Sequence, residues 1–262
     1  MLPNDYQTAL SLQRQGRLEE AIELHRSILQ RQPEHHGALH SLGMALFFCN
    51  KIDEAVGFVE QSLTLCATKA AYHNNYGTIL NRLNKLDEAR IAFERALALQ
   101  PDYADALSNL GSVFLQLRRP PDETERLLSR AIGIQPNHTN ALLHFANLFI
   151  GQAKFLEALP YLEKHVSLVP PSARLYHQLA HLYGECGKHE LSKQFFHQAS
   201  ALLDGKDVWR WKYLAYCSSF FETEEEIDRY WNWLNAELDV AVAESPFYNW
   251  RTLGIREQLG RR

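Results

Sequence analysis

The chain has 262 residues, 46% of them hydrophobic and 22% charged, and its formal net charge is −4. That charge argues against nucleic-acid binding, which needs a basic surface to neutralise phosphates. No apolar run reaches the roughly 18 residues expected of a membrane-spanning helix. The N-terminal sequence MLPNDYQTAL lacks the basic and apolar regions of a signal peptide. Composition therefore predicts a protein that binds neither nucleic acid nor a membrane.

The cysteines and short motifs point away from metal, redox and nucleotide chemistry. Four cysteines are scattered without CxxC spacing: Cys49, Cys66, Cys186 and Cys217. Isolated cysteines of this kind are typical of reduced thiols, which predicts a cytoplasmic location. Neither GxGxxG nor GxxxxGK[ST] is present. We therefore expect no cofactor, and we predict that the chain is not an enzyme.

The sequence repeats itself at spacings of 34, 34, 35, 34 and 34 residues. Three columns of residues keep this period. The first holds small residues: Ala9, Gly43, Gly77, Gly111, Ala146 and Ala180. The second follows the alanine of the DEA motif: Ala21, Ala55, Ala89, Thr124, Ala158 and Ser192. The third is mostly proline: Pro33, Ala67, Pro101, Pro136, Pro170 and Asp204.

Each column has a physical reason. Between the columns the apolar residues recur with a period near 3.6, which predicts two helices in every cycle. Small residues in the first helix allow its partner to approach closely, and this packing offsets the cost of about 1 kcal/mol that glycine carries inside a helix. Proline ends the second helix because it lacks an N–H donor and clashes with the preceding turn.

In chain order we expect helix pairs over residues 2–35, 36–69, 70–103, 104–138, 139–172 and 173–206. The first cycle has the polar His25 where an aromatic residue is usual. The fourth has one extra residue and the pair Pro120 and Pro121 between its helices, so its turn is expected to bulge. The sixth has Ser192 in the alanine column and ends in Asp204. Atypical outer cycles suit the ends of an array, where one face is wet.

This pattern resembles the tetratricopeptide repeat family over residues 2–206. It is most complete in the third cycle, with Tyr76, Gly77, Leu80, Ala89, Phe93, Ala96 and Pro101. The resemblance implies an all-α fold in which about six helix pairs stack into a right-handed superhelix. It also implies a non-catalytic scaffold that binds a protein or peptide in a concave groove lined by the first helix of each pair.

Residues 207–262 are a different kind of sequence, because all five tryptophans lie between residues 209 and 250. The segment DVWRWKYLAYCSSFF predicts a helix that stacks on the sixth cycle. Thr223 with Glu226 forms a capping box at the start of a second, amphipathic helix. We interpret this part as a helical cap or linker, and self-association through its aromatic residues is a structural alternative.

The same segment supports a second hypothesis about function. The stretches WRWKYLAYC, EEEIDRYW and WRTL resemble the linker after the repeats in bacterial O-linked N-acetylglucosamine transferase-like (SPINDLY-like) proteins. That resemblance implies that the chain is the substrate-recruiting arm of a glycosyltransferase whose catalytic domain is absent from this chain. No catalytic residue is assigned here.

Three further columns should point into the groove. Two residues before the small-residue column stand Gln7, Ser41, Asn75, Asn109, His144 and Gln178. Directly after that column stand Leu10, Met44, Thr78, Ser112, Asn147 and His181. Three residues before it stand Tyr6, His40, Asn74, Ser108, Leu143 and His177. From the third cycle on, these side chains are mostly amides, hydroxyls and imidazoles, and amides offer both donors and acceptors to an extended peptide.

From these columns and their surroundings we predict the following ligand-binding residues: Asn74, Asn75, Asn109, His144, Asn147, Arg174, His177, Gln178 and His181. A solvated helix face with nothing bound is the alternative. The first two cycles instead offer the apolar side chains of Met44, Phe47 and Phe48, which either hold a ligand side chain or pack inside. The groove columns contain no lysine for a carboxylate clamp. His177 and His181 lack a third metal ligand, so no metal site is predicted.

Overall fold

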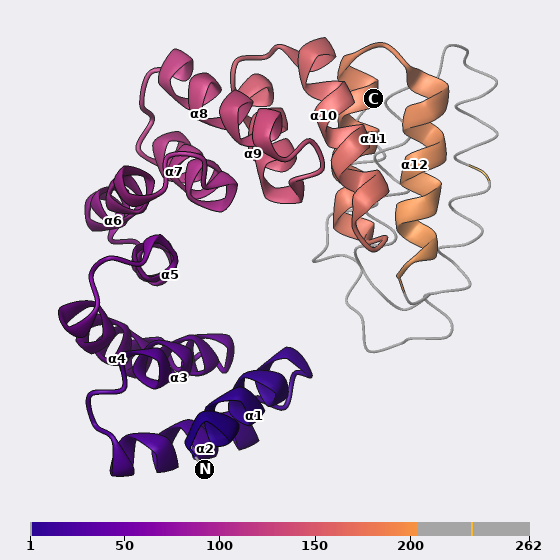
Figure 1. Cartoon of the computed structure of the whole chain (residues 1–262). Coiled ribbons are helices and arrows are strands. Elements are labelled where there is room, and N and C mark those ends of the chain that lie inside the picture. The colour runs from indigo at the N-terminus through magenta and orange to yellow at the C-terminus, as the bar shows by residue number, and fades with distance from the viewer. Residues whose placement is uncertain (1, 204–231, 233–262) are drawn as a thin grey trace. The chain divides into compact units, whose positions relative to one another are not determined.

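A computed structural model describes residues 2–203 of the chain, together with residue 232. Residues 2–203 form twelve α-helices and no strand (Figure 1). The predicted all-α fold is therefore confirmed. Asp204 and the cap predicted over residues 207–262 lie outside the described residues. The helices are α1 Leu2–Arg14, α2 Leu18–Arg31, α3 His36–Phe48, α4 Ile52–Leu65, α5 Ala70–Arg82, α6 Leu86–Leu99, α7 Ala104–Gln116, α8 Pro121–Ile134, α9 Thr139–Gly151, α10 Phe155–Leu168, α11 Ala173–Glu185 and α12 His189–Ala201.

The chain divides into two compact units, Met1–Leu148 and Phe149–Arg262, and α9 crosses their boundary. In the first unit α1 packs on α2, α3 on α4, α5 on α6 and α7 on α8, and successive pairs contact through α2–α3, α4–α5 and α6–α7. In the second unit α11 packs on both α10 and α12. Each cycle expected from the sequence encloses two helices, although the domain boundaries themselves stay predictions.

The helices of a pair approach closely at the small-residue column, as predicted. A Cβ atom added to Gly77 would lie 2.8 Å from the Phe93 ring of α6. One added to Gly111 would lie 2.7 Å from Leu128 of α8. The Phe93 and Leu128 side chains are themselves completely buried. Glycine in α5 and α7 thus lets a bulky side chain of the partner helix rest directly on the backbone.

Every turn from a first to a second helix has the same backbone geometry. One residue has a positive φ, between 52° and 78°: Gly16, Asn50, Asn84, Arg118, Ala153 and Gly187. The N–H of the next residue donates to the carbonyl five residues earlier, at 2.9–3.0 Å, for example Lys85 to Leu80. This hydrogen bond is the mark of a Schellman motif, which satisfies a carbonyl at the end of the first helix.

The extra residue of the fourth cycle is accommodated locally. Helix α8 begins three residues after the positive-φ residue Arg118, whereas α6 begins two residues after Asn84. Pro120 occupies the added position in an extended conformation, with φ −49° and ψ 131°, and Pro121 is the first residue of the helix. Proline suits that first position because the N–H it lacks would have no helical acceptor.

The second helices end two residues before the proline column, at Leu65 in α4 and Leu99 in α6. Ala67 replaces proline in the second cycle, yet Cys66 before it has φ −150° and ψ 87°, close to the −137° and 91° of Gln100 before Pro101. The turn therefore forms without proline.

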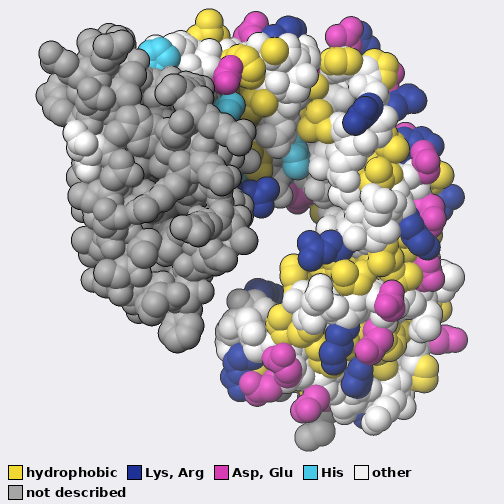
Figure 2. Space-filling model, turned by 180° about the vertical axis from the view of Figure 1, so that it is seen from behind, with side chains coloured by type: hydrophobic (Ala, Val, Ile, Leu, Met, Phe, Trp, Pro, Cys, Tyr) yellow, Lys and Arg dark blue, Asp and Glu magenta, His cyan; other side chains and the backbone are white. Residues whose placement is uncertain are grey.

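Polar residues in the packing columns are buried. His25 is fully buried, and its Nε2 donates to Gln13 Oε1 at 3.2 Å. The Ser192 hydroxyl donates to the Ala180 carbonyl at 2.7 Å. The Thr124 hydroxyl is also buried but has no hydrogen-bond partner among the described residues. Some hydrophobic side chains stay at the surface over the N-terminal helices, among basic and acidic ones (Figure 2).

Gly77→Ala should lower the free energy of unfolding by about 1–2 kcal/mol, because the added methyl group overlaps the Phe93 ring. Gly57→Ala is the matched control, since it makes the same change inside α4 with no atom within 4 Å of the new methyl group. It should raise stability by up to about 1 kcal/mol. Urea unfolding monitored by circular dichroism measures both. Equal effects would contradict the close approach of α5 and α6.

Thr124→Ala should raise the free energy of unfolding by about 1 kcal/mol, because it removes a buried hydroxyl that lacks a partner. Ser192→Ala is the comparison at the equivalent position, where the hydroxyl is hydrogen-bonded, and it should give no gain. Thermal unfolding of the two variants measures the change in stability that each substitution causes. An equal gain from both substitutions would show that hydrogen bonding at this column has no influence on stability.

Candidate functional site

Side chains on adjacent first helices meet in pairs that are 35 residues apart. The Asn109 amide donates to Asn74 Oδ1 at 3.0 Å, which joins α7 to α5. The Asn75 amide donates to His40 Nε2 at 3.1 Å, which joins α5 to α3. Near the other end of α5 and α7 the Gln116 amide donates to Asn81 Oδ1 at 3.1 Å. One register therefore holds along the first helices of the N-terminal unit.

These contacts build a continuous polar row, which we define as His40, Asn75, Asn74 and Asn109. The Asn74 amide completes it by donating to Asn75 Oδ1 at 3.4 Å. Asn74 is only 5% exposed, so it lies beneath the row and hydrogen-bonds to both Asn75 and Asn109. Asn75 and Asn109 are half-buried. Within the described residues Asn109 Oδ1 accepts no hydrogen bond, which leaves an acceptor for a ligand at the α7 end.

An aromatic stack closes the α3 end of the row. The His40 ring lies on Tyr72 with 4.0 Å between centroids and 12° between planes. Tyr72 Oη lies 3.0 Å from His36 Nδ1, and Lys69 Nζ lies 5.1 Å from the Tyr72 ring centroid. Sequence reasoning did not find Tyr72. The sequence did mark this position: the equivalent residues one repeat before and after it are alanines, Ala38 and Ala106, so a tyrosine is unusual there.

Burial sets the protonation of this end of the row. It lowers the pKa of His40 to about 4, with smaller contributions from the positive charges of Lys69 and His36. Burial also lowers the pKa of His25 to about 4, and His35 adds to the effect. Both imidazoles are therefore neutral at pH 7. A neutral His40 can accept the hydrogen bond from Asn75, whereas a protonated ring would face that donor with another N–H.

The nine predicted ligand-binding residues fall into two groups. Asn74, Asn75 and Asn109 lie in the polar row, and half-buried His144 and exposed Asn147 lie on α9 in the same unit. The remaining four, on α11 of the second unit, are Arg174, His177, Gln178 and His181.

The two predicted histidines of α11 contact side chains of α11 and α12, within the second unit. The His177 ring packs edge-on against Phe196, with 5.3 Å between centroids, and burial lowers the pKa of His177. His181 Nε2 lies 3.9 Å from Glu185 Oε1. Among the described residues no group of three histidine, cysteine or acidic side chains is placed to hold a metal ion.

Of the three apolar residues that the sequence offered in the second cycle, two pack inside and one lies at the surface. Met44 and Phe47 are half-buried and pack against the core between α3 and α4. Phe48 is 63% exposed.

Comparisons with known proteins agree with this geometry. Models of the tetratricopeptide repeat match residues 6–70, 77–117 and 173–202. Protein CTR9 homolog of Arabidopsis thaliana is 29% identical over 102 residues, which are 38% of this chain and 9% of that protein. PilF of Pseudomonas aeruginosa superposes with a TM-score of 0.69 at 20% identity, over 78% of this chain and 92% of PilF. YrrB superposes with a TM-score of 0.52 at 20% identity, over 71% of this chain and 94% of YrrB.

The chain therefore carries tetratricopeptide repeats in the all-α, superhelical fold of such proteins. The family matches end at residue 202, before the segment that resembles a glycosyltransferase linker. That segment lies outside the described residues, so this resemblance stays a prediction. No helix in the described part of the chain is long and apolar enough to cross a membrane.

Stability should fall on acidification, because His25 and His40 have folded-state pKa values near 4 against 6.5 for ordinary histidine. A lowered folded-state pKa gives stabilisation that is complete above pH 6.5 and is lost as the pH falls toward 4. Each histidine should account for about 1–2 kcal/mol of unfolding free energy between pH 7 and pH 5. Urea unfolding at several pH values measures this loss.

Two substitutions assign the effect to these rings. His25→Phe supplies the aromatic residue found at the equivalent Phe93, and His40→Gln keeps an acceptor for Asn75. The double variant should show a much flatter pH dependence. An unchanged slope would mean that neither imidazole is held neutral by folding.

Proposed function

We propose that the chain is a non-catalytic scaffold that binds an extended protein or peptide segment across α3, α5 and α7. The observation that carries this proposal is the polar row, which crosses three first helices through direct side-chain hydrogen bonds. Such bonds fix the amides in position before a ligand arrives, so less conformational entropy is lost on binding.

The spacing of the helices suits an extended ligand. Packed helices lie about 8–10 Å apart, and an extended chain rises about 3.3 Å per residue. Each first helix would therefore meet the ligand at about every third residue. Asn75 and Asn109, one repeat apart, would contact main-chain groups at that interval, and the Asn109 carbonyl would accept from a ligand N–H. YrrB is described as having an unusual peptide-binding site, which makes peptide recognition a natural proposal for this fold.

The chemistry of the row favours binding over catalysis. Its members are amides and a neutral imidazole whose Nε2 already accepts from Asn75. No nucleophile stands beside a base in this row, as covalent catalysis would require. We propose that the predicted residues of α9, His144 and Asn147, belong to the same binding face, and that those of α11 contact a ligand within the second unit. We also propose a cytoplasmic protein, since Cys49, Cys66 and Cys186 are free thiols. The glycosyltransferase-arm alternative gains no support from the comparisons.

The double substitution Asn75→Ala and Asn109→Ala tests the proposal. Peptides selected by the wild-type protein from a random dodecapeptide library should bind this variant at least tenfold more weakly, because two hydrogen bonds of about 1 kcal/mol each are lost. Fluorescence anisotropy with labelled peptides measures the affinity, and thermal unfolding confirms that the variant is folded.

The matched control is Gln30→Ala with Gln61→Ala, which removes two exposed amides from the second helices α2 and α4. This control should bind like the wild type. Equal affinities for all three proteins would remove the polar row from the account, and so would a wild-type protein that selects no peptide.

A further inference from the structure

A second feature of the first helices lies at their C-terminal ends, beyond the polar row. We define the aromatic patch as Met44, Phe47 and Phe48. The Phe47 ring meets Phe48 edge-on, with 5.7 Å between centroids and 65° between planes. Phe47 and Met44 are anchored on the core, while Phe48 projects to solvent with 63% of its surface exposed. An exposed ring held on a half-buried ring is a preformed apolar contact surface.

Arginines flank this patch on the neighbouring first helices. Arg14 of α1 and Arg82 of α5 occupy the position equivalent to Phe48, one repeat before and one repeat after it. Helices α1 and α5 both contact α3. The register of 35 residues seen in the polar row sets Phe47 opposite Arg82. Arg14 and Arg82 are exposed, and neither forms an ion pair with another described residue.

Acidic side chains are few on the first helices themselves, although Glu19 of α2 lies near the patch, with its Oε1 4.0 Å from Cys49 Sγ. Helices α3 and α5 contain no aspartate or glutamate. Helix α1 has only Asp5, which pairs with Arg31 of α2 at 2.8 Å. By contrast, each second helix of the N-terminal unit carries three carboxylates: Glu19, Glu20 and Glu23 in α2, Asp53, Glu54 and Glu60 in α4, Asp87, Glu88 and Glu94 in α6, and Asp122, Glu123 and Glu125 in α8.

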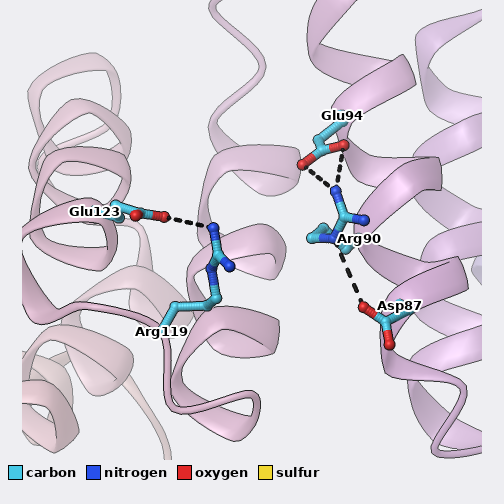
Figure 3. Close-up of polar contacts among 5 residues, drawn as sticks. All are labelled: Asp87, Arg90, Glu94, Arg119 and Glu123. Carbon is cyan, nitrogen blue, oxygen red and sulfur yellow. Dashed lines mark hydrogen bonds and ion pairs between the residues drawn. The ribbon is translucent and has the colours of Figure 1, made fainter.

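On the second helices several arginines pair with acids, although the exposed Arg95 of α6 and Arg126 of α8 form no ion pair with another described residue. Arg90 lies 2.9 Å from Glu94 and 3.9 Å from Asp87, all on α6 (Figure 3). Arg119, just before α8, lies 3.2 Å from Glu123 (Figure 3). The net charge of the whole chain is −4, so an acidic ligand would be repelled by most of the surface. At the ends of α1 and α5, Arg14 and Arg82 supply positive charge that is not paired with a described acid.

We propose that the aromatic patch, with Arg14 and Arg82, is a specificity subsite for a partner segment that carries a large apolar side chain flanked by aspartate or glutamate. The apolar side chain covers Phe48 and rests on the stems of the arginines. The flanking carboxylates accept charge-assisted hydrogen bonds from the guanidinium groups. This inference rests on the proposed function, because the same segment continues over the polar row.

Selection from a phage-displayed dodecapeptide library without a free C-terminus tests the subsite. The wild-type protein should enrich peptides in which aspartate or glutamate lies within three positions of an aromatic residue, leucine or methionine. The double variant Arg14→Glu and Arg82→Glu should enrich lysine or arginine at those positions instead. An enriched set with no acidic bias, or the same bias from both proteins, would overturn the subsite.

Affinities of one selected acidic peptide locate the contact. Phe48→Ser and Arg82→Glu should each weaken its binding about tenfold, because a covered ring is lost or like charges meet. Phe48 and Arg82 are exposed, so the fold should be unaffected. Leu156→Ser on α10 and Arg95→Glu on α6 are matched controls at exposed sites and should change nothing. Equal affinities for variants and controls would refute the subsite.

The two proposals fail in different ways. Peptides that depend on Asn75 and Asn109 but tolerate Phe48→Ser would leave the polar row standing and remove the subsite. A wild-type protein that enriches no peptide would remove both.

Discussion

Contact between the backbone of a first helix and a bulky side chain of its partner is the constraint on which the rest of the structure depends. At Gly77 there is no room for a side chain beside Phe93, and at Gly111 there is none beside Leu128. This packing fixes the distance between the helices of a pair, and the Schellman turn that ends each first helix fixes where the second begins. Repeating the unit about every 34 residues then carries one geometry along the chain.

The proposed binding face is a consequence of that repetition. With the first helices in one register, positions 35 residues apart meet, and short polar side chains can hydrogen-bond across neighbouring repeats. The packing residues cannot carry specificity, since the repeat requires them whatever is bound. Specificity falls to the positions that the repeat leaves free. Here those positions hold amides and imidazoles in the middle of the first helices, and aromatic residues and arginines at their ends.

Much of the fold could be predicted from the sequence, because the spacing of Gly77, Ala89 and Pro101 reports local constraints on helix packing and helix ends. The site could be predicted only in part. The columns named Asn75 and Asn109, whose role in binding stays a prediction, but they did not reveal that Asn74 is buried beneath the row or that His40 stacks on Tyr72. Those details depend on contacts between repeats. The positive φ of Ala153 was equally hidden, since nothing in alanine itself indicates a left-handed conformation.

The account claims above all that a ligand touches the amides that cross the first helices. The side-chain amide groups of Asn75 and Asn109 give their own signals in a ¹⁵N–¹H correlation spectrum, and titration with a selected peptide follows them directly. The account predicts that these signals shift together with the backbone signals of α3, α5 and α7, while those of α4 and α6 move little. Shifts confined to the second helices, with both amide signals unmoved, would contradict it.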